Sequence, residues 1–197
     1  MKFEDGTLKI GRKLSELDRK VLEFVQILDR EGVKYVLVSG YVAILTGRSR
    51  GTEDIDVIIQ ELTPEGTEKL VDTLVEAGYW CINSTKEKIH GMLEDRIAVR
   101  FAEEDEVIPN FEVEFAQDEF ETEALENRTR AEVDSNEIFI SPLELQISYK
   151  LYLGSERDFE DALHLYKLFE GELDGEKLEK YCRELDVGEK LHGLREA

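Results

Sequence analysis

The chain has 197 residues, of which 41% are hydrophobic, so it can bury one full-sized core or a main domain with a small appendage. Its net charge of -21 argues against non-specific coating of DNA or RNA, although a local basic groove is still compatible with it. No apolar run approaches the roughly 20 residues of a membrane helix, and residues 1–5 lack the apolar stretch of a signal peptide. We therefore expect a soluble cytoplasmic protein. Cys81 and Cys182 lie far apart and outside any CxxC motif, which indicates neither a disulfide framework nor a zinc site.

The first part of the chain alternates helices and strands. In chain order the hydrophobic pattern predicts a helix capped by Ser15 that ends at Gly32, a buried strand over 33–38, a short helix over 41–46, a strand over 54–59 and a helix from Pro64 to about Ala77. Ser39 and Gly40 form the turn between the first of these strands and the short helix.

The second part contains more strands and then helices. A strand is predicted over 79–82, and segments 96–101 and 110–115 both alternate, which indicates an antiparallel pair in a mixed sheet. After Ile138-Phe139-Ile140, helices are predicted near 142–153, 156–170 and 174–186, separated by Gly154 and Gly171. We therefore expect an α+β core over residues 1–136 and a C-terminal helical region over residues 137–197.

Asp54 and Asp56 occupy alternate positions of a predicted strand, so both carboxylates project from one face. Two neighbouring carboxylates repel and raise each other's pKa unless a cation lies between them. Mg²⁺, or Mn²⁺ in its place, neutralises such a pair and also holds the phosphate oxygens of a nucleoside triphosphate. The pair therefore predicts a metal site that serves phosphoryl transfer.

The turn at Ser39 and Gly40 has the groups that phosphates need, namely backbone N–H groups at a helix start, a small hydroxyl and a glycine that permits close approach. A third carboxylate is expected on a neighbouring strand, where it would complete the metal site or deprotonate an acceptor hydroxyl. Glu112 and its alternative Glu114 both qualify, because they share one face of the same predicted strand. Glu112 is narrowly favoured as the third metal ligand.

The longer pattern resembles the nucleotidyltransferase superfamily, whose signature is a small-residue turn, a short helix and then Asp-x-Asp on the next strand. It is similar to the branch that includes the AbiEii-like toxins of toxin–antitoxin systems. The match is carried by Gly40, Tyr41, Ala43, Gly47, Arg48, Arg50, Thr52, Asp54 and Asp56. The resemblance implies a nucleotidyltransferase fold, with a mixed β-sheet flanked by helices, and nucleotide-binding roles for Ser39, Gly40, Arg48, Arg50 and Thr52.

The C-terminal helices are similar to that branch in Ser141 to Tyr152 and in the Arg-Asp-x-x-Asp pattern that begins at Arg157. The resemblance implies that Lys150 contacts the triphosphate as a catalytic residue and that Arg157 and Asp158 contribute to nucleotide binding. Each of these residues also has an alternative interpretation without a functional role. Lys150 could extend from a helix whose other face is core, and Arg157 with Asp158 and Asp161 could be a surface ion-pair set.

The sequence thus predicts a metal-dependent enzyme that transfers a nucleoside monophosphate from an NTP to a hydroxyl of RNA, such as tRNA, or of a protein, and that acts as a toxin with an antitoxin partner. The alternatives are an inactive binding module with this fold and a small-molecule nucleotidyltransferase of the aminoglycoside type. Five basic side chains could form either a solvated face or an RNA groove: Lys86, Lys88, His90, Arg96 and Arg100.

Overall fold

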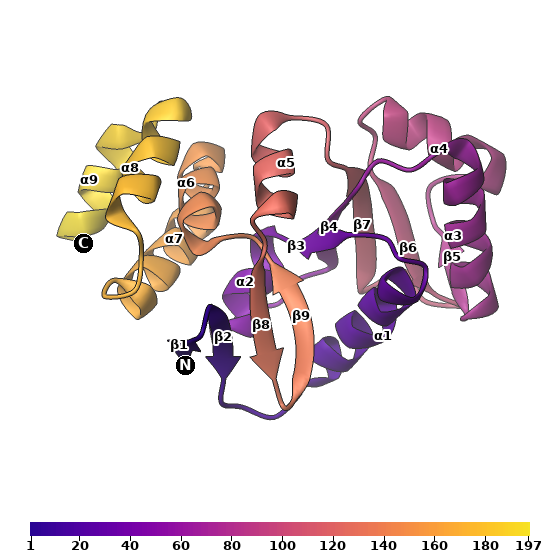
Figure 1. Cartoon of the computed structure of the whole chain (residues 1–197), viewed down its shortest axis with the longest axis horizontal. Helices are drawn as coiled ribbons and strands as arrows, with labels where there is room; N and C mark the ends of the chain where they lie inside the picture. The colour runs from indigo at the N-terminus through magenta and orange to yellow at the C-terminus, as the bar shows by residue number, and fades with distance from the viewer.

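A computed structural model describes residues 1–197, which form one nine-stranded mixed sheet with helices on both faces (Figure 1). The spatial order of the strands is β1-β2-β8-β9-β3-β4-β7-β6-β5. Their bounds are β1 Lys2–Glu4, β2 Thr7–Ile10, β3 Tyr35–Leu37, β4 Asp54–Ile59, β5 Tyr79–Cys81, β6 Val99–Glu103, β7 Asn110–Phe115, β8 Thr129–Val133 and β9 Asn136–Ile140. The predicted α+β class and the mixed sheet are confirmed. None of the helices is both long and apolar enough to span a membrane.

The helices are α1 Glu16–Arg30, α2 Ser39–Leu45, α3 Pro64–Glu76, α4 Lys86–Glu94, α5 Glu119–Glu126, α6 Leu143–Leu153, α7 Glu156–Phe169, α8 Gly175–Glu184 and α9 Gly188–Glu196. Helix α1 begins with the predicted cap, because the Ser15 side chain accepts from the Asp18 N–H while the Asp18 side chain accepts from the Ser15 N–H. Helix α3 begins with Pro64 at its first position, where a missing N–H costs nothing.

The centre of the sheet positions the acidic strand. Strand β4 runs antiparallel to β3 on one side and parallel to β7 on the other. Its side chains alternate, so that Ile55 and Val57 are buried on one face while Asp54 and Asp56 are half-buried on the opposite face. The apolar face packs on α1, whose Phe24 ring stacks on Phe111 of β7 with centroids 3.9 Å apart. The acidic face is therefore the one left for chemistry.

Helix α5 covers the other face of β3 and β4, on the side of the sheet opposite α1 (Figure 1). A small apolar cluster joins α5 to the sheet through Ala124, Leu125 and Val36. This cluster is separate from the main core of 44 buried residues. The acidic face is thus only partly closed by a helix, which leaves space next to β4.

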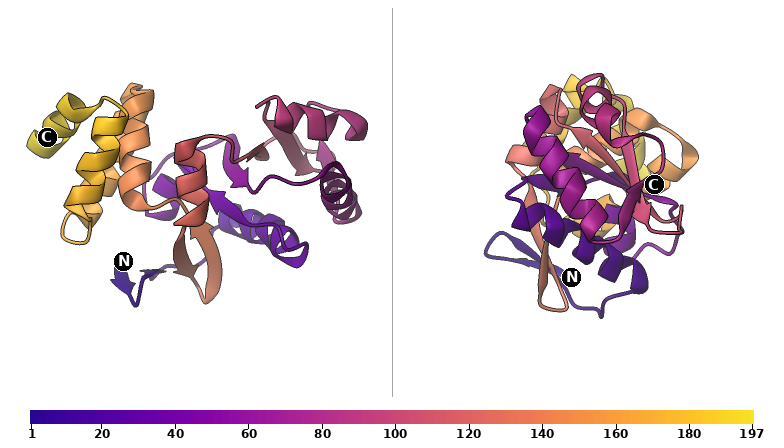
Figure 2. Two further views of the ribbon diagram at one scale, coloured as in Figure 1. Left: turned by 45° about the horizontal axis from the view of Figure 1, so that its top comes forward. Right: turned by 90° about the vertical axis from the view of Figure 1, so that its right-hand side faces the viewer.

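Helices α6 to α9 lie together at one end of the sheet, and α3 and α4 lie at the other end (Figure 2). Strand β9 extends the sheet to Ile140, where it pairs with Leu37 of β3, and the helical part starts at Leu143. The expected division between residues 136 and 137 therefore falls inside β9. The two parts share a core, since Ile147 and Leu151 of α6 belong to the same cluster as the sheet.

Several elements have no counterpart in the predictions. These are β1, β2, β8, α4, α5 and α9. Strands β1 and β2 hold only three and four residues, which is too short for an alternating pattern to stand out. The pairing of β6 with β7 is antiparallel, as predicted, although β6 starts at Val99 and not at Arg96.

Candidate active site

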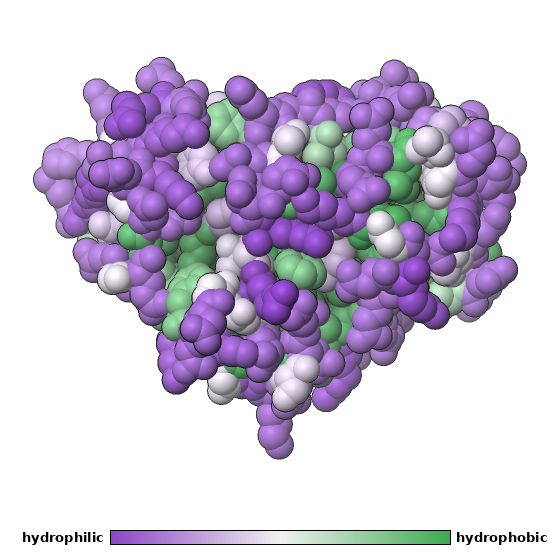
Figure 3. Space-filling view, in the orientation of Figure 1, coloured by the Kyte–Doolittle hydropathy of each residue, from purple (hydrophilic) through white to green (hydrophobic).

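A cavity of about 220 Å³ lies on the acidic side of the sheet, between the end of β3, the middle of β4 and β7, and the helices α5 and α6. Half of its lining residues are hydrophobic. The face of the molecule in Figure 3 is predominantly hydrophilic, with apolar side chains visible mainly between protruding polar ones. Six polar side chains of the lining are considered below: Ser39, Asp56, Glu112, Glu114, Gln146 and Lys150.

The register between β4 and β7 distinguishes the two candidate glutamates. Glu112 pairs directly with Asp56, whereas Glu114 pairs with Ile58, one pleat further along. Glu112 is also held by the Arg100 guanidinium, with Nε and Nη2 at 3.1 and 3.0 Å from its Oε2. Glu114 has no such ion pair and lines the cavity beside it. The carboxylate next to Asp56 is therefore Glu112, and the unpaired one is Glu114.

The surroundings of Asp56 disfavour the ionised form of its carboxyl group. Burial, followed by the charge of Asp54, raises its pKa to about 6, although the nearby Ser39 hydroxyl and the Lys150 ammonium act in the opposite direction. Burial also raises the pKa of Glu114, with further contributions from Glu121 and Glu112. A cation placed among these carboxylates would relieve both effects.

The donor set suits a hard divalent cation, because carboxylate oxygens are the ligands that Mg²⁺ takes from proteins. Asp54 and Asp56 share a face of β4, and Glu112 lies beside Asp56 on the neighbouring strand. No three acidic, histidine or cysteine side chains come together in a group that could hold a metal alone.

Asp54 itself does not line the cavity. Thr52 donates its hydroxyl to the backbone carbonyl of Asp54 at 2.8 Å and to its Oδ1 at 3.2 Å. This contact orients the first aspartate at the start of β4. Thr52 itself does not line the cavity, and its hydroxyl contacts Asp54 only.

The turn between β3 and α2 places Ser39 beside Asp56. Ser39 adopts a left-handed backbone with φ of 58°, which is unusual for a residue with a side chain. Its N–H donates to Oε1 of Gln146 at 3.2 Å, and Nε2 of Gln146 donates back to the Ser39 carbonyl at 2.9 Å. The Ser39 N–H is thus already bonded, and its hydroxyl is the group that faces the cavity.

Gly40 is buried and does not line the cavity. The space beside its Cα is filled by Arg50, since a Cβ at Gly40 would lie 2.5 Å from Nη2 of Arg50. Arg50 in turn bonds Asp161 of α7 at 2.5 Å. In this structure Gly40 makes room for a guanidinium, which links the turn to the helical region.

Lys150 projects from α6 into the cavity and is only 3% exposed. Its Nζ lies 2.6 Å from Oδ1 of Asp158 and 3.3 Å from Oδ2 of Asp161. Burial opposes ionisation of Asp158, but the hydrogen bonds from Lys150 and Ser155 hold its pKa below the ordinary value. These two carboxylates fix the position of the ammonium.

Asp161 is completely buried and forms ion pairs with three cations, which are Arg48, Arg50 and Lys150. Arg48 also bonds Glu160 and the backbone carbonyl of Arg157, whose own side chain is exposed. The sequence pattern gave roles to Arg48, Arg50 and Lys150, whereas Asp161 entered only as the last residue of the Arg-Asp-x-x-Asp pattern and, in the alternative interpretation, as a member of a surface ion-pair set. Asp161 is buried because α7 packs against the loop before β4, and this contact cannot be predicted from the sequence of α7 alone.

The five basic side chains on and near α4 and β6 form no continuous groove. Lys86 pairs with Glu68 and Asp72, and Arg100 pairs with Glu112. His90 bonds Thr67, and Arg96 donates to a backbone carbonyl. Lys88 is exposed.

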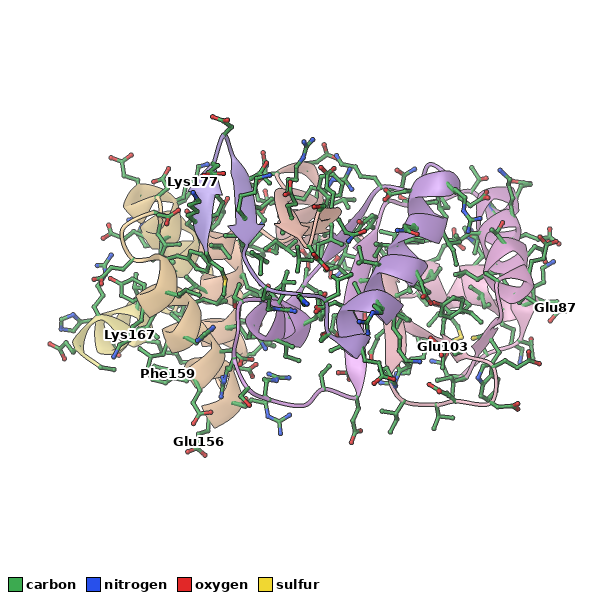
Figure 4. The ribbon with its side chains drawn as sticks, turned by 90° about the horizontal axis from the view of Figure 1, so that it is seen from below. Glu87, Glu103, Glu156, Phe159, Lys167 and Lys177 are labelled. Atoms are coloured by element: carbon green, nitrogen blue, oxygen red, sulfur yellow. The ribbon has the colours of Figure 1, made fainter.

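Figure 4 shows Glu87 of α4 at one end of the molecule and Glu156, Phe159 and Lys167 of α7 at the other.

The fold is similar to that of an antigenic nucleotidyltransferase-like protein from Paracoccidioides brasiliensis, with a TM-score of 0.58 and 16% identity over 94% of this chain and 95% of that chain. It is similar to ANT(2'')-Ia in complex with adenylyl-2''-tobramycin, with a TM-score of 0.59 and 14% identity over 87% of this chain and 98% of that one. The lincomycin-bound lincosamide antibiotic adenylyltransferase LnuA gives a TM-score of 0.52 and 17% identity over 80% of this chain and 99% of that one. No family model and no curated protein matches the sequence. At these identities the likeness concerns architecture, and the chain has a nucleotidyltransferase fold.

Proposed function

We propose that this protein is a metal-dependent nucleotidyltransferase that moves a nucleoside monophosphate from an NTP to a hydroxyl acceptor. The observation that carries the proposal is the register that sets Glu112 directly beside Asp56, in a cavity that also holds Ser39 and Lys150. The resemblance of the sequence to nucleotidyltransferases and the similar folds of solved nucleotidyltransferases support it.

Asp54, Asp56 and Glu112 would hold Mg²⁺ or Mn²⁺, which would supply positive charge to the phosphates. The acceptor oxygen attacks the α-phosphorus, the bond to pyrophosphate breaks, and the proton of the hydroxyl passes to a carboxylate. Glu114 is placed to take that proton, because it lines the cavity and has no ion-pair partner.

Lys150 would neutralise the charge that develops on the leaving pyrophosphate. Its ammonium is held in the cavity by Asp158 and Asp161, so it needs no reorganisation when the nucleotide binds. Arg50 shares Asp161 with Lys150 and packs against Gly40, which places a second cation close to the turn.

Two classes of acceptor fit this reaction. One is a hydroxyl of RNA or protein, with the toxin role and antitoxin partner that the sequence resemblance implies, and the other is a small molecule. The charge of the cavity favours a small acceptor over RNA, because Glu112, Glu114 and Glu121 line it and Lys150 is its one basic lining residue. Two of the similar structures are described as holding adenylyl-2''-tobramycin and lincomycin.

The test incubates the protein with each labelled NTP, Mg²⁺ and one of three acceptors: total tRNA, a cell protein extract or a panel of amino and hydroxylated antibiotics. We expect label transfer by the wild-type protein, and none by Asp56→Asn. Asp72→Asn makes the same chemical change on the exposed side of α3 and should transfer like the wild type. NTP binding without transfer to any acceptor would favour an inactive binding module.

A further inference from the structure

We infer that Gln146 is a positioning residue that holds the Ser39 turn in the conformation needed for nucleotide transfer. The inference rests on the proposed function and concerns a residue to which the sequence analysis assigned no role. Gln146 lies on α6, which belongs to the helical region, whereas Ser39 follows β3 in the sheet. The two residues are separated by 107 positions in the chain.

The contact between them is reciprocal. The side-chain amide of Gln146 accepts from the Ser39 N–H at 3.2 Å and donates to the Ser39 carbonyl at 2.9 Å. An amide that bonds both polar groups of one residue restricts the peptide planes on both sides of it. Gln146 is 4% exposed, so these two bonds form with little competition from water in the folded protein.

Ser39 needs such support for two reasons. It is the first residue of α2, where an N–H has no partner within the helix, and Gln146 supplies that partner. Its φ of 58° lies in the left-handed region, which residues with a Cβ adopt only when their surroundings impose it. Ser39 and Asp56 both line the cavity, so the conformation of this backbone sets what the cavity presents beside Asp56.

Gln146 lies on the same helix as Lys150, so α6 connects the Ser39 turn to the ammonium group of the site. Gln146 and Lys150 are one helical turn apart on α6, and both line the cavity. A single helix therefore carries the group that shapes the turn and the group that would meet the phosphates. Displacement of α6 would change both at once, which gives the helical region a direct role in assembling the site.

The chain contains a matched control. Gln60 follows β4 and its Oε1 accepts from the Lys34 N–H at 3.0 Å, next to the opposite end of β3. Like Gln146, it is a glutamine that bonds the backbone at the end of β3, but it does not line the cavity. Gln146→Met removes two side-chain bonds to the backbone inside the site, and Gln60→Met removes one outside it.

The first readout is hydrogen exchange at the Ser39 amide, measured by NMR on the full chain without nucleotide. We expect about tenfold faster exchange in Gln146→Met, because one hydrogen bond is lost, and no change in Gln60→Met. Gln146→Ala serves if the Met variant does not fold, because it also removes both bonds to Ser39. Unchanged protection of the Ser39 amide in Gln146→Ala would overturn the inference.

The second readout is transfer, measured as kcat and KM for the NTP. Gln146→Met should lower kcat/KM by about 10 to 100-fold, while Gln60→Met stays within about twofold of the wild type. Equal losses in both variants, or unchanged Ser39 exchange in Gln146→Met, would overturn the inference. If the wild-type protein transfers nothing, the proposed function fails, and exchange at Ser39 by itself decides whether Gln146 holds the turn.

Discussion

The phenol of Tyr41 donates a 2.8 Å hydrogen bond to Oδ1 of Asp18, and both residues are buried. Tyr41 is in α2, directly after the turn of the candidate site, and Asp18 is in the first turn of α1. Asp18 also accepts from the Ser15 N–H and hydroxyl, each at 2.7 Å, and forms an ion pair with Arg12. One carboxylate thus anchors the short helix of the site to the main core.

We predict that Asp18→Asn lowers the free energy of unfolding by about 3 kcal/mol at pH 7, because Arg12 loses its buried partner. Urea denaturation followed by circular dichroism measures the change. Asp29→Asn, an exposed position near the end of the same helix, is the control and should shift the value by less than about 0.5 kcal/mol. Equal effects of the two substitutions would contradict the structural role of Asp18.

The same carboxylate predicts a dependence of stability on pH. Burial opposes ionisation, but the hydrogen bonds from Arg12, Ser15 and Tyr41 lower its pKa to about 2, from an ordinary value of 3.8. A group whose pKa is lower in the folded state stabilises that state above its unfolded pKa, and the contribution is lost as pH falls from 3.8 towards 2. The difference in unfolding free energy between the wild type and Asp18→Asn should therefore shrink across that range.

The pKa of Asp56 is raised in the folded state, whereas that of Asp18 is lowered. Its pKa of about 6 means that the folded state disfavours the ionised form, so its contribution to stability declines as pH rises from 3.8 to about 6. Asp56→Asn should therefore raise the free energy of unfolding at pH 8 by about 1 to 3 kcal/mol while it abolishes transfer. Transfer by the wild type should fall as pH drops through 6, because the metal needs the carboxylate ionised. A less stable Asn variant at pH 8 would contradict this account.

Substitution of Glu112 and of Glu114 should change the Mg²⁺ dependence of transfer differently. Glu112→Gln is expected to raise the Mg²⁺ concentration required for half-maximal transfer by about 10-fold or more, since Glu112 lies beside Asp56. Glu114→Gln should lower kcat and leave that concentration unchanged. Titration of Mg²⁺ at saturating NTP distinguishes them, and the reverse pattern would assign the third carboxylate to Glu114.

Gly40 and Gly91 provide a paired test of the contact with Arg50. Gly91→Ala, in α4 with open space beside it, should stabilise the protein by about 0.5 to 1 kcal/mol. Gly40→Ala is also in a helix but should destabilise it by about 1 to 3 kcal/mol, because the Cβ displaces the Arg50 guanidinium from its place against Gly40. Thermal denaturation measures both. In an Arg50→Ala background the penalty at Gly40 should largely disappear, and an unchanged penalty would contradict this explanation.

Local patterns predicted the long elements of the fold. Alternation placed β4 and β7, and helical spacing with a cap at Ser15 placed α1, because both signals arise within one element. Short strands such as β1 and short helices such as α5 were missed, since three and eight residues are too few for a periodic pattern to stand out. The same limit applies to the start of β6, which the pattern placed three residues too early.

The sequence by itself determined that Asp54 and Asp56 share a face and that a small-residue turn precedes them, because the two-residue repeat of a strand is a local property. Only the tertiary structure decided which glutamate lies beside Asp56, which depends on the register between β4 and β7. It also decided that Gln146 meets Ser39 and that Asp161 meets Arg50. These contacts join residues more than 100 positions apart, and such pairings are set by how elements pack and not by the pattern within any one of them.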